Sequence, residues 1–132
     1  MIALRFAELG ARVIVDFFRN RKPAEQTAAD IRTLGRQALV KKDDIGTDKG
    51  LDHLFQEIEN NFNGLDILVN NAASGYNRPA LQQKTSGWDW TMKINARSLL
   101  FGAHHTVPLM ESLGGEYIVS ISSPGALRVL PE

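Results

Sequence analysis

The chain has 132 residues, of which 43% are hydrophobic, so it carries enough apolar surface for a packed core. Lys and Arg number 15 and balance 15 Asp and Glu, which argues against a basic surface for nucleic acid or anionic membranes. No apolar run approaches the roughly 20 residues that span a bilayer, and the chain has no cysteine, which excludes disulfides and Cys-based metal sites and is consistent with the cytoplasm.

The hydrophobic pattern predicts helices and strands in regular alternation. Helices are expected over 2–9, 23–34 and 86–113, and over 51–62 with Thr47 as the candidate N-cap before it. Strands are expected over 11–17, 37–42, 65–69 and 117–120. Glycines stand where the helices should end, at Gly10, Gly35, Gly64 and Gly114. This alternation predicts one α/β domain over residues 1–132, with a parallel sheet and right-handed crossovers.

The first and last elements indicate which part of such a domain is present. A complete doubly wound domain starts with a strand followed by phosphate-binding glycines, and no such glycine cluster lies near residue 1. We therefore expect a partial Rossmann-type, doubly wound parallel sheet that lacks the first strand and the C-terminal part. Since the first strand would be central, its absence should separate strands 11–17 and 37–42 from strands 65–69 and 117–120, and should leave the chain poorly stable.

Two asparagines followed by small residues come directly after the predicted strand 65–69. Ligands of open α/β sheets bind at the carboxyl ends of the strands, and small residues allow a planar ligand to approach the backbone. The alternative is an asparagine-rich turn that satisfies loop amides. The strand-to-loop context favours a ligand site at Asn71, Ala72 and Ala73.

These residues carry a resemblance to a known family. Asn70 to Ala73 resembles the Asn-Asn-Ala-Gly motif of short-chain dehydrogenases/reductases, with Ala73 in place of the usual glycine. Three other stretches match that family in the same order: Asp44-Ile45, Lys93-Ile94-Asn95-Ala96 and Tyr117 to Ser123. Within the family, the segments 71–75 and 88–92 are most similar to enoyl-ACP reductase III.

The resemblance assigns roles to individual residues. It implies that Asp44 and Ile45 contact the adenine, and that Asn71, Ala72 and Ala73 bind the cofactor. A catalytic role follows for Asn95, which would help to hold a water near the catalytic lysine; the alternative is a satisfied buried amide. Ser123 would polarise a substrate carbonyl. The alternative for Ser123 is a polar strand end capped by the turn at Pro124-Gly125.

The residues after strand 11–17 bear on the choice of cofactor. An acid at that strand end holds the ribose of NAD, whereas an arginine accommodates the phosphate of NADP. Phe17 occupies the acid's place and Arg19 follows, so we expect NADP, with NAD less favoured. Asp16 lies one residue before the NAD position and weakens this preference. Alternatively, Arg19, Arg21 and Lys22 belong to a solvated loop.

The resemblance also implies an activity. It indicates an NADP-dependent oxidoreductase that reduces enoyl- or 3-oxoacyl thioesters, free or on an acyl carrier, in fatty-acid synthesis, and is a homo-oligomer at full length. The family's catalytic tyrosine and lysine follow the serine and fall beyond residue 132, while Tyr76 and Tyr117 lie in the wrong elements. We therefore expect this chain alone to be inactive. The alternative is an inactive remnant that binds nucleotide weakly or associates with family subunits.

Two further patterns receive non-functional interpretations. His104 and His105 are adjacent on a helix and point about 100° apart, so no metal site is expected there. Trp88 and Trp90 are expected to be packing residues rather than a stacking platform.

Overall fold

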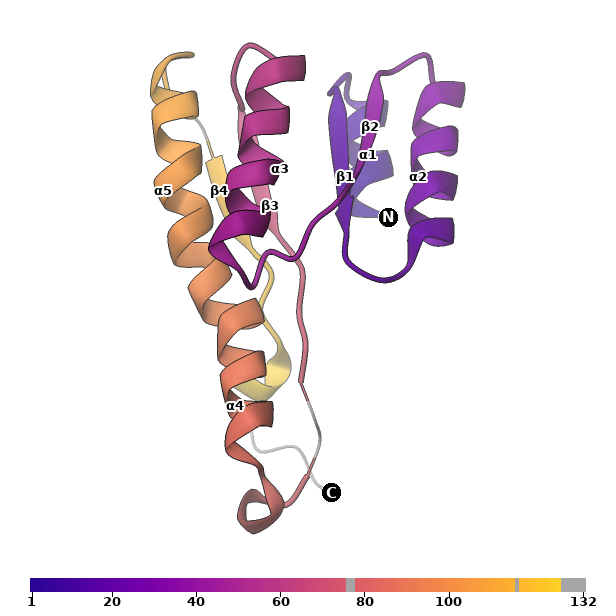
Figure 1. Cartoon of the computed structure of the whole chain (residues 1–132). Coiled ribbons are helices and arrows are strands. Elements are labelled where there is room, and N and C mark those ends of the chain that lie inside the picture. Colours follow the sequence, from indigo (N-terminus) through magenta and orange to yellow (C-terminus); the bar gives the residue numbers. More distant parts are fainter. Residues whose placement is uncertain (76–77, 116, 127–132) are drawn as a thin grey trace. The chain divides into compact units, whose positions relative to one another are not determined.

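A computed structural model describes residues 1–75, 78–115 and 117–126 of the chain (Figure 1). The chain divides into two compact units, Met1–Asn61 and Phe62–Glu132. The four strands described are parallel and form two separate two-stranded sheets, one in each unit. The predicted α/β class and the predicted separation of the two strand pairs are therefore confirmed.

The first unit alternates helices with a parallel strand pair. Its elements are α1 (Ile2–Glu8), β1 (Val13–Phe17), α2 (Arg21–Thr33), β2 (Ala38–Lys42) and α3 (Asp48–Asn61). Strands β1 and β2 run in register from Val13 opposite Ala38 to Phe17 opposite Lys42. Helix α2 begins at Arg21 rather than at the predicted Pro23, so Arg21 and Lys22 form its first turn and do not belong to the solvated loop of the alternative interpretation.

Small side chains build the core of this unit. Ala7, Ala28 and Ile31 are fully buried, and Ala38 is almost so. Alanines at these positions let the backbones of α1 and α2 approach the strand pair closely, which fixes the sheet beneath them. Partly buried residues complete the cluster: Ala3, Leu4, Val13, Val15 and Val40.

The loop between β2 and α3 is held against the first turn of α3. The hydroxyl oxygen of Thr47 accepts the Gly50 N–H at 3.1 Å, as predicted for an N-cap, and its O–H donates to the Asp44 carbonyl at 2.9 Å. A Cβ added at Gly50 would overlap that same carbonyl oxygen. The absence of a side chain at Gly50 therefore allows the helix to approach Asp44.

The second unit pairs two strands beside a long interrupted helix. Its elements are β3 (Ile67–Asn70), a 3₁₀ turn (Ala80–Gln82), α4 (Thr85–Met92), a π-helical segment (Lys93–Arg97), α5 (Ser98–Glu111), β4 (Tyr117–Ser120) and a 3₁₀ turn (Pro124–Ala126). Figure 1 shows α4 and α5 as one continuous helical rod. The predicted long helix is thus present, and a π turn that the sequence did not indicate lies within it.

The sheet of the second unit is poorly covered. The side chains of β4 are all exposed, with Tyr117 at 68% and Val119 at 41%, although an apolar strand of this kind is typical of a buried position. A two-stranded sheet offers few neighbours that could cover such residues. None of the helices in the described segments is both long and apolar enough to cross a membrane.

Candidate functional site

The carboxyl ends of β1 and β2 bring the predicted adenine-side residues to one edge. Phe17 lies opposite Lys42 at the end of the register, and the Asp43 N–H donates to the Phe17 carbonyl at 3.1 Å. Arg19 follows β1 and Asp44 follows β2, so both residues leave the sheet at the same edge. This is the edge at which ligands of parallel α/β sheets bind.

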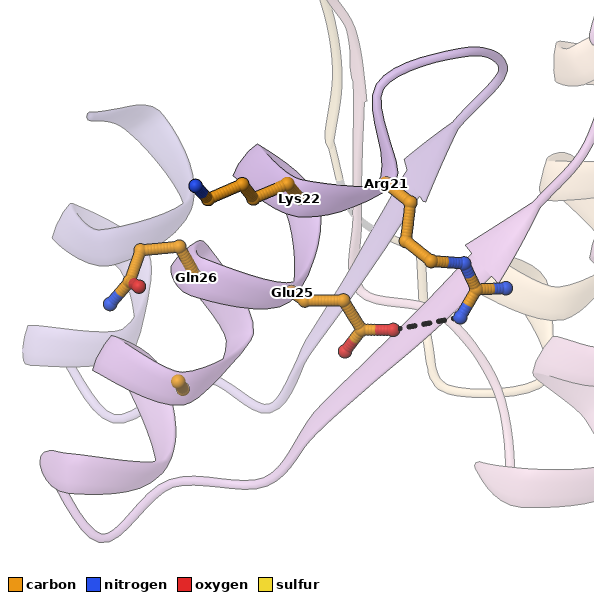
Figure 2. Close-up of a pocket in the computed structure, with 5 residues that line it drawn as sticks. Arg21, Lys22, Glu25 and Gln26 are labelled. Carbon is orange, nitrogen blue, oxygen red and sulfur yellow. Dashed lines mark hydrogen bonds and ion pairs between the residues drawn. The ribbon is translucent and has the colours of Figure 1, made fainter.

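The cations after β1 differ in their surroundings. The Arg19 guanidinium lies 5.4 Å from the ring centroid of the exposed Phe18. Arg21 pairs with Glu25 at 3.1 Å (Figure 2), which compensates part of its charge. Arg21 and Glu25 also line an open depression with Lys22, Gln26 and Ala29. All five residues belong to α2, so this depression contains no residue that the sequence assigns to a site.

Asp16 is tied into the strand ends. Its Oδ1 accepts the Asp43 N–H at 3.2 Å, and Asp43 is itself buried, with its Oδ1 2.6 Å from Nδ1 of His53. Burial, and then the charge of Asp43, raise the pKa of Asp16 to about 7. The carboxyl of Asp16 therefore serves the junction of β1 and β2, and near neutral pH a large share of it is protonated.

Asp44 and Ile45 lie in a tight turn. Oδ1 of Asp44 accepts the Gly46 N–H at 3.0 Å, and its backbone carbonyl accepts the Thr47 N–H at 3.0 Å. Both Asp44 and Ile45 are half-buried. The turn is thus rigidly formed, while the adenine contact of these two residues remains a prediction.

A second group of predicted residues meets at the carboxyl edge of β3 and β4. Asn70 lies opposite Ser120, and the Ile121 N–H donates to the Asn70 carbonyl at 3.0 Å. From this edge, Asn71, Ala72 and Ala73 continue as an exposed loop. Exposed backbone with only methyl side chains at two positions fits the approach of a planar ligand.

Ser123 follows β4 at the same edge. Its side chain is exposed, and its hydroxyl oxygen accepts the Gly125 N–H at 3.2 Å. That hydrogen bond matches the predicted alternative of a strand end capped by a turn. An exposed hydroxyl in this position still has an O–H to donate, so the predicted catalytic role is compatible with the geometry.

Asn95 anchors the loop after β3. Its Oδ1 accepts the Ser74 N–H and its Nδ2 donates to the Ser74 carbonyl, both at 2.8 Å. The alternative of a satisfied amide is right about hydrogen bonding but wrong about burial, because Asn95 is exposed. The π segment Lys93–Arg97 carries this residue.

Sequence reasoning missed Ser74 and Trp90. The indole Nε1–H of Trp90 donates to the Ser74 hydroxyl at 2.7 Å, so every polar group of Ser74 takes part in a hydrogen bond. The available signal was the position of Ser74 directly after the cofactor motif. Trp88 is 62% exposed, so the prediction that it packs is wrong.

Within the described residues, no group of three His, Cys, Asp or Glu side chains is arranged to hold a metal ion. His104 instead makes an edge-on contact with Phe101, with ring centroids 5.3 Å apart.

Comparison with known proteins gives a consistent result. A family model described as short chain dehydrogenase matches residues 1–132. The chain is 31% identical over 130 residues to 1-cyclohexenylcarbonyl-CoA reductase from Streptomyces collinus, covering 98% of this chain and 46% of that protein. It spans about half the length of the relatives that it matches.

Solved structures agree in fold. A 7α-hydroxysteroid dehydrogenase complexed with NADH and 7-oxo glycochenodeoxycholic acid is 30% identical, with a TM-score of 0.91 over 98% of this chain and 50% of that one. A short chain dehydrogenase from Burkholderia cenocepacia J2315 in complex with NADP is 27% identical, with a TM-score of 0.86 over 98% and 52%. The chain therefore belongs to the short-chain dehydrogenase family, whose members are oxidoreductases.

Proposed function

We propose that the protein is part of an NADP-dependent enzyme that reduces enoyl- or 3-oxoacyl thioesters. This enzyme would act in fatty-acid synthesis in the cytoplasm. The observation that carries the proposal is the exposed loop Asn71–Ala73, which starts at the strand edge shared with Ser123 and is anchored through Ser74 to Asn95. When bound, the cofactor supplies or accepts the hydride. The residues of this chain bind and orient it, and Ser123 donates to the developing charge on the substrate.

The preference for NADP rests on two side chains at the other strand edge. Arg19 offers a guanidinium suited to a phosphate. Oδ1 of the half-buried Asp16 accepts the Asp43 N–H at the junction of β1 and β2, and this acid lies one residue before the position that would hold the ribose of NAD. Similar structures contain NADP in one case and NADH in another, so the choice depends on the residues of this chain.

The thioester substrate rests on the resemblance to enoyl-ACP reductase III and on the similar reductase of a coenzyme A thioester. A steroid substrate is the competing possibility, since the similar hydroxysteroid dehydrogenase acts on a different chemical class. Turnover by the full-length protein with a crotonyl thioester and with a 7-oxo steroid distinguishes the two classes, and we expect turnover of the thioester.

A homo-oligomer is the proposed assembly. Helix α5 exposes Leu100 at 56% and Val107 at 41%, and apolar side chains of this kind are suited to a helical subunit interface. Light scattering of the purified chain across a tenfold concentration range would detect such association. A mass that stays monomeric throughout would contradict it.

The test is nucleotide binding by the purified chain. We expect it to bind NADPH more tightly than NADH, and Arg19→Ala to weaken NADPH binding about tenfold while leaving NADH binding unchanged. Lys22→Ala, on the depression along α2, is the matched control. Loss of both affinities, or of neither, would contradict the role of Arg19.

Turnover is a separate measurement. We propose that the chain alone does not oxidise NADPH with crotonyl or acetoacetyl thioesters, because the family's proton-donating tyrosine is not among its residues. Measurable turnover would contradict this. Failure to bind any nicotinamide nucleotide would instead favour a remnant that only associates with family subunits.

A further inference from the structure

Ser74, in the loop that follows β3, is held by three hydrogen bonds. Its N–H and carbonyl bond the two side-chain atoms of Asn95 at 2.8 Å, and its hydroxyl accepts the Trp90 indole N–H at 2.7 Å. Its neighbours Asn71, Ala72 and Ala73 are all exposed. The hydrogen bonds of Ser74 therefore hold the exposed segment Asn71–Ala73 in place from one end.

Restraining Ser74 also orients its neighbours. In a trans peptide the N–H and the C=O point in opposite directions. Since the Ser74 N–H and carbonyl both point to Asn95, the Ala73 carbonyl and the Gly75 N–H are directed away from Asn95. The loop therefore presents one backbone acceptor and one backbone donor on the side opposite to the helix, in directions fixed by its anchor.

Two residues of the helix reach Ser74, and the π segment begins between them. Trp90 and Asn95 are five residues apart, and in a regular α-helix such residues are separated by roughly 140° around the axis. In the π segment the Ser98 N–H bonds the carbonyl of Lys93, which is the i to i+5 pattern that brings residues five apart towards one face. The π turn thus lets the indole and the amide act on the same residue.

We infer that Trp90 is a positioning residue for the cofactor, because its indole and the Ser74 hydroxyl form a clamp on the loop Asn71–Gly75. Asn95 holds the Ser74 backbone, whereas the clamp restrains the side chain and so limits rotation of the loop about that single anchor. A loop held in its binding conformation loses less entropy on binding. This inference rests on the proposed function, since it concerns affinity for NADP(H).

The first experiment examines the clamp without cofactor. The chain has two tryptophans, so its ¹⁵N–¹H spectrum contains two indole signals, and Trp88→Phe identifies that of Trp90. We expect Ser74→Ala to shift the Trp90 indole signal and to speed its exchange with water, while the signal of Trp88 stays in place. A Trp90 signal that Ser74→Ala leaves unchanged would overturn the clamp.

The second experiment measures NADPH affinity by calorimetry. Trp90→Phe keeps an aromatic ring but loses the donor, and Ser74→Ala keeps the loop backbone but loses the acceptor. We expect each to weaken binding about fivefold, and the double variant to be no weaker than either, because both remove the same hydrogen bond. Trp88→Phe, an exposed indole on the same helix, is the control and should bind like the wild type.

A conservative variant separates positioning from general loss of structure. Ser74→Thr keeps the hydroxyl, so it should retain most of the affinity that Ser74→Ala loses. If Trp90→Phe and Ser74→Ala bind NADPH as tightly as the wild type, the inference is wrong while the proposed function stands. If the wild type binds no nicotinamide nucleotide, the proposed function fails and the inference fails with it.

Discussion

The sheets of the two units are stabilised differently. In the first unit, α1 and α2 cover the β1–β2 pair through side chains that are fully buried, such as Ala28 and Ile31. In the second unit, β4 is exposed along its whole length, and the loop after β3 is held by hydrogen bonds to Ser74. Close packing thus supports the sheet of the first unit, whereas hydrogen bonds to Ser74 position the loop predicted to bind the cofactor in the second.

This difference matters for function because the two kinds of contact respond differently to change. A buried apolar contact loses both transfer free energy and packing when it is truncated. Exposed hydrogen bonds contribute less to the free energy of unfolding, but they fix the orientation of the groups that they join. Mutations in the buried core of the first unit should therefore act on the free energy of unfolding, and mutations around Ser74 should act on binding.

The largest effect is expected from truncating the core of the first unit. Ile31→Ala removes a side chain with no exposed surface and should lower the free energy of unfolding by about 3 to 4 kcal/mol. Ile118→Ala, on the exposed β4, should cost under about 1 kcal/mol. Urea unfolding of both variants provides the measurement, and equal losses would remove the contrast between the two sheets.

The contact between Gly50 and Asp44 gives the next largest effect. Gly50→Ala places a methyl group against the Asp44 carbonyl and should cost about 3 kcal/mol, because backbone must move to make room. Gly75→Ala is the control, since a Cβ there meets nothing within 4 Å. If the two variants unfold at the same urea concentration, the close approach of α3 to the loop is refuted.

The stability contribution of Asp16 should depend on pH. Its pKa of about 7 in the folded protein lies above the ordinary value of 3.8, so the folded state keeps the proton to higher pH than the unfolded state, and stability falls as pH rises from about 4 to 7. Asp16→Asn still accepts the Asp43 N–H and should be more stable than the wild type by on the order of 2 kcal/mol at pH 8, with little difference at pH 4. Thermal unfolding at both pH values tests this, with the exposed Asp66→Asn as control. If Asp16→Asn were more stable than the wild type by the same amount at both pH values, the raised pKa of Asp16 could not be the cause.

The smallest effect is expected in α5. The Thr106 hydroxyl is fully buried and finds no hydrogen-bond partner among the described residues, so Thr106→Val should raise the free energy of unfolding by about 1 kcal/mol. Ser98→Ala is the matched variant on the same helix and should have the opposite sign, because Ser98 donates to the Ile94 carbonyl. Urea unfolding of the two variants should show these opposite signs; a loss in both would mean that Thr106 does have a partner.

Much of the fold could be predicted because hydrophobic periodicity and glycine positions are local signals. Helices α2 and α3 and strand β4 all arise where the pattern indicates them. The parallel pairing followed from alternation alone, and the separation of the strand pairs followed from the order of strands in a doubly wound sheet. Burial could not be predicted in this way, since it depends on which elements lie against a strand, and β4 is exposed for that reason.

The candidate site was predictable only in part. Asn71, Asn95 and Ser123 were predicted as site residues from motifs, and the structure places their segments in the second unit. The bond between Trp90 and Ser74 was missed because it joins residues far apart in sequence through a helix register that composition does not encode. The raised pKa of Asp16 was missed for the same reason, as it results from burial and from Asp43, which follows the neighbouring strand.

The π segment makes the length of this helix, and not only its side chains, important for function. A π turn holds one residue more than the α-helical turn that it replaces. Deleting Ala96, which follows Asn95 in the segment Lys93–Arg97, would let the turn relax to an ordinary α-helix, and everything before the deletion would rotate by about 100° relative to α5. Trp90 and Asn95 would then face different directions, although both residues would still be present. At this point the chain should tolerate substitution of an exposed residue such as Lys93 far better than a change in length.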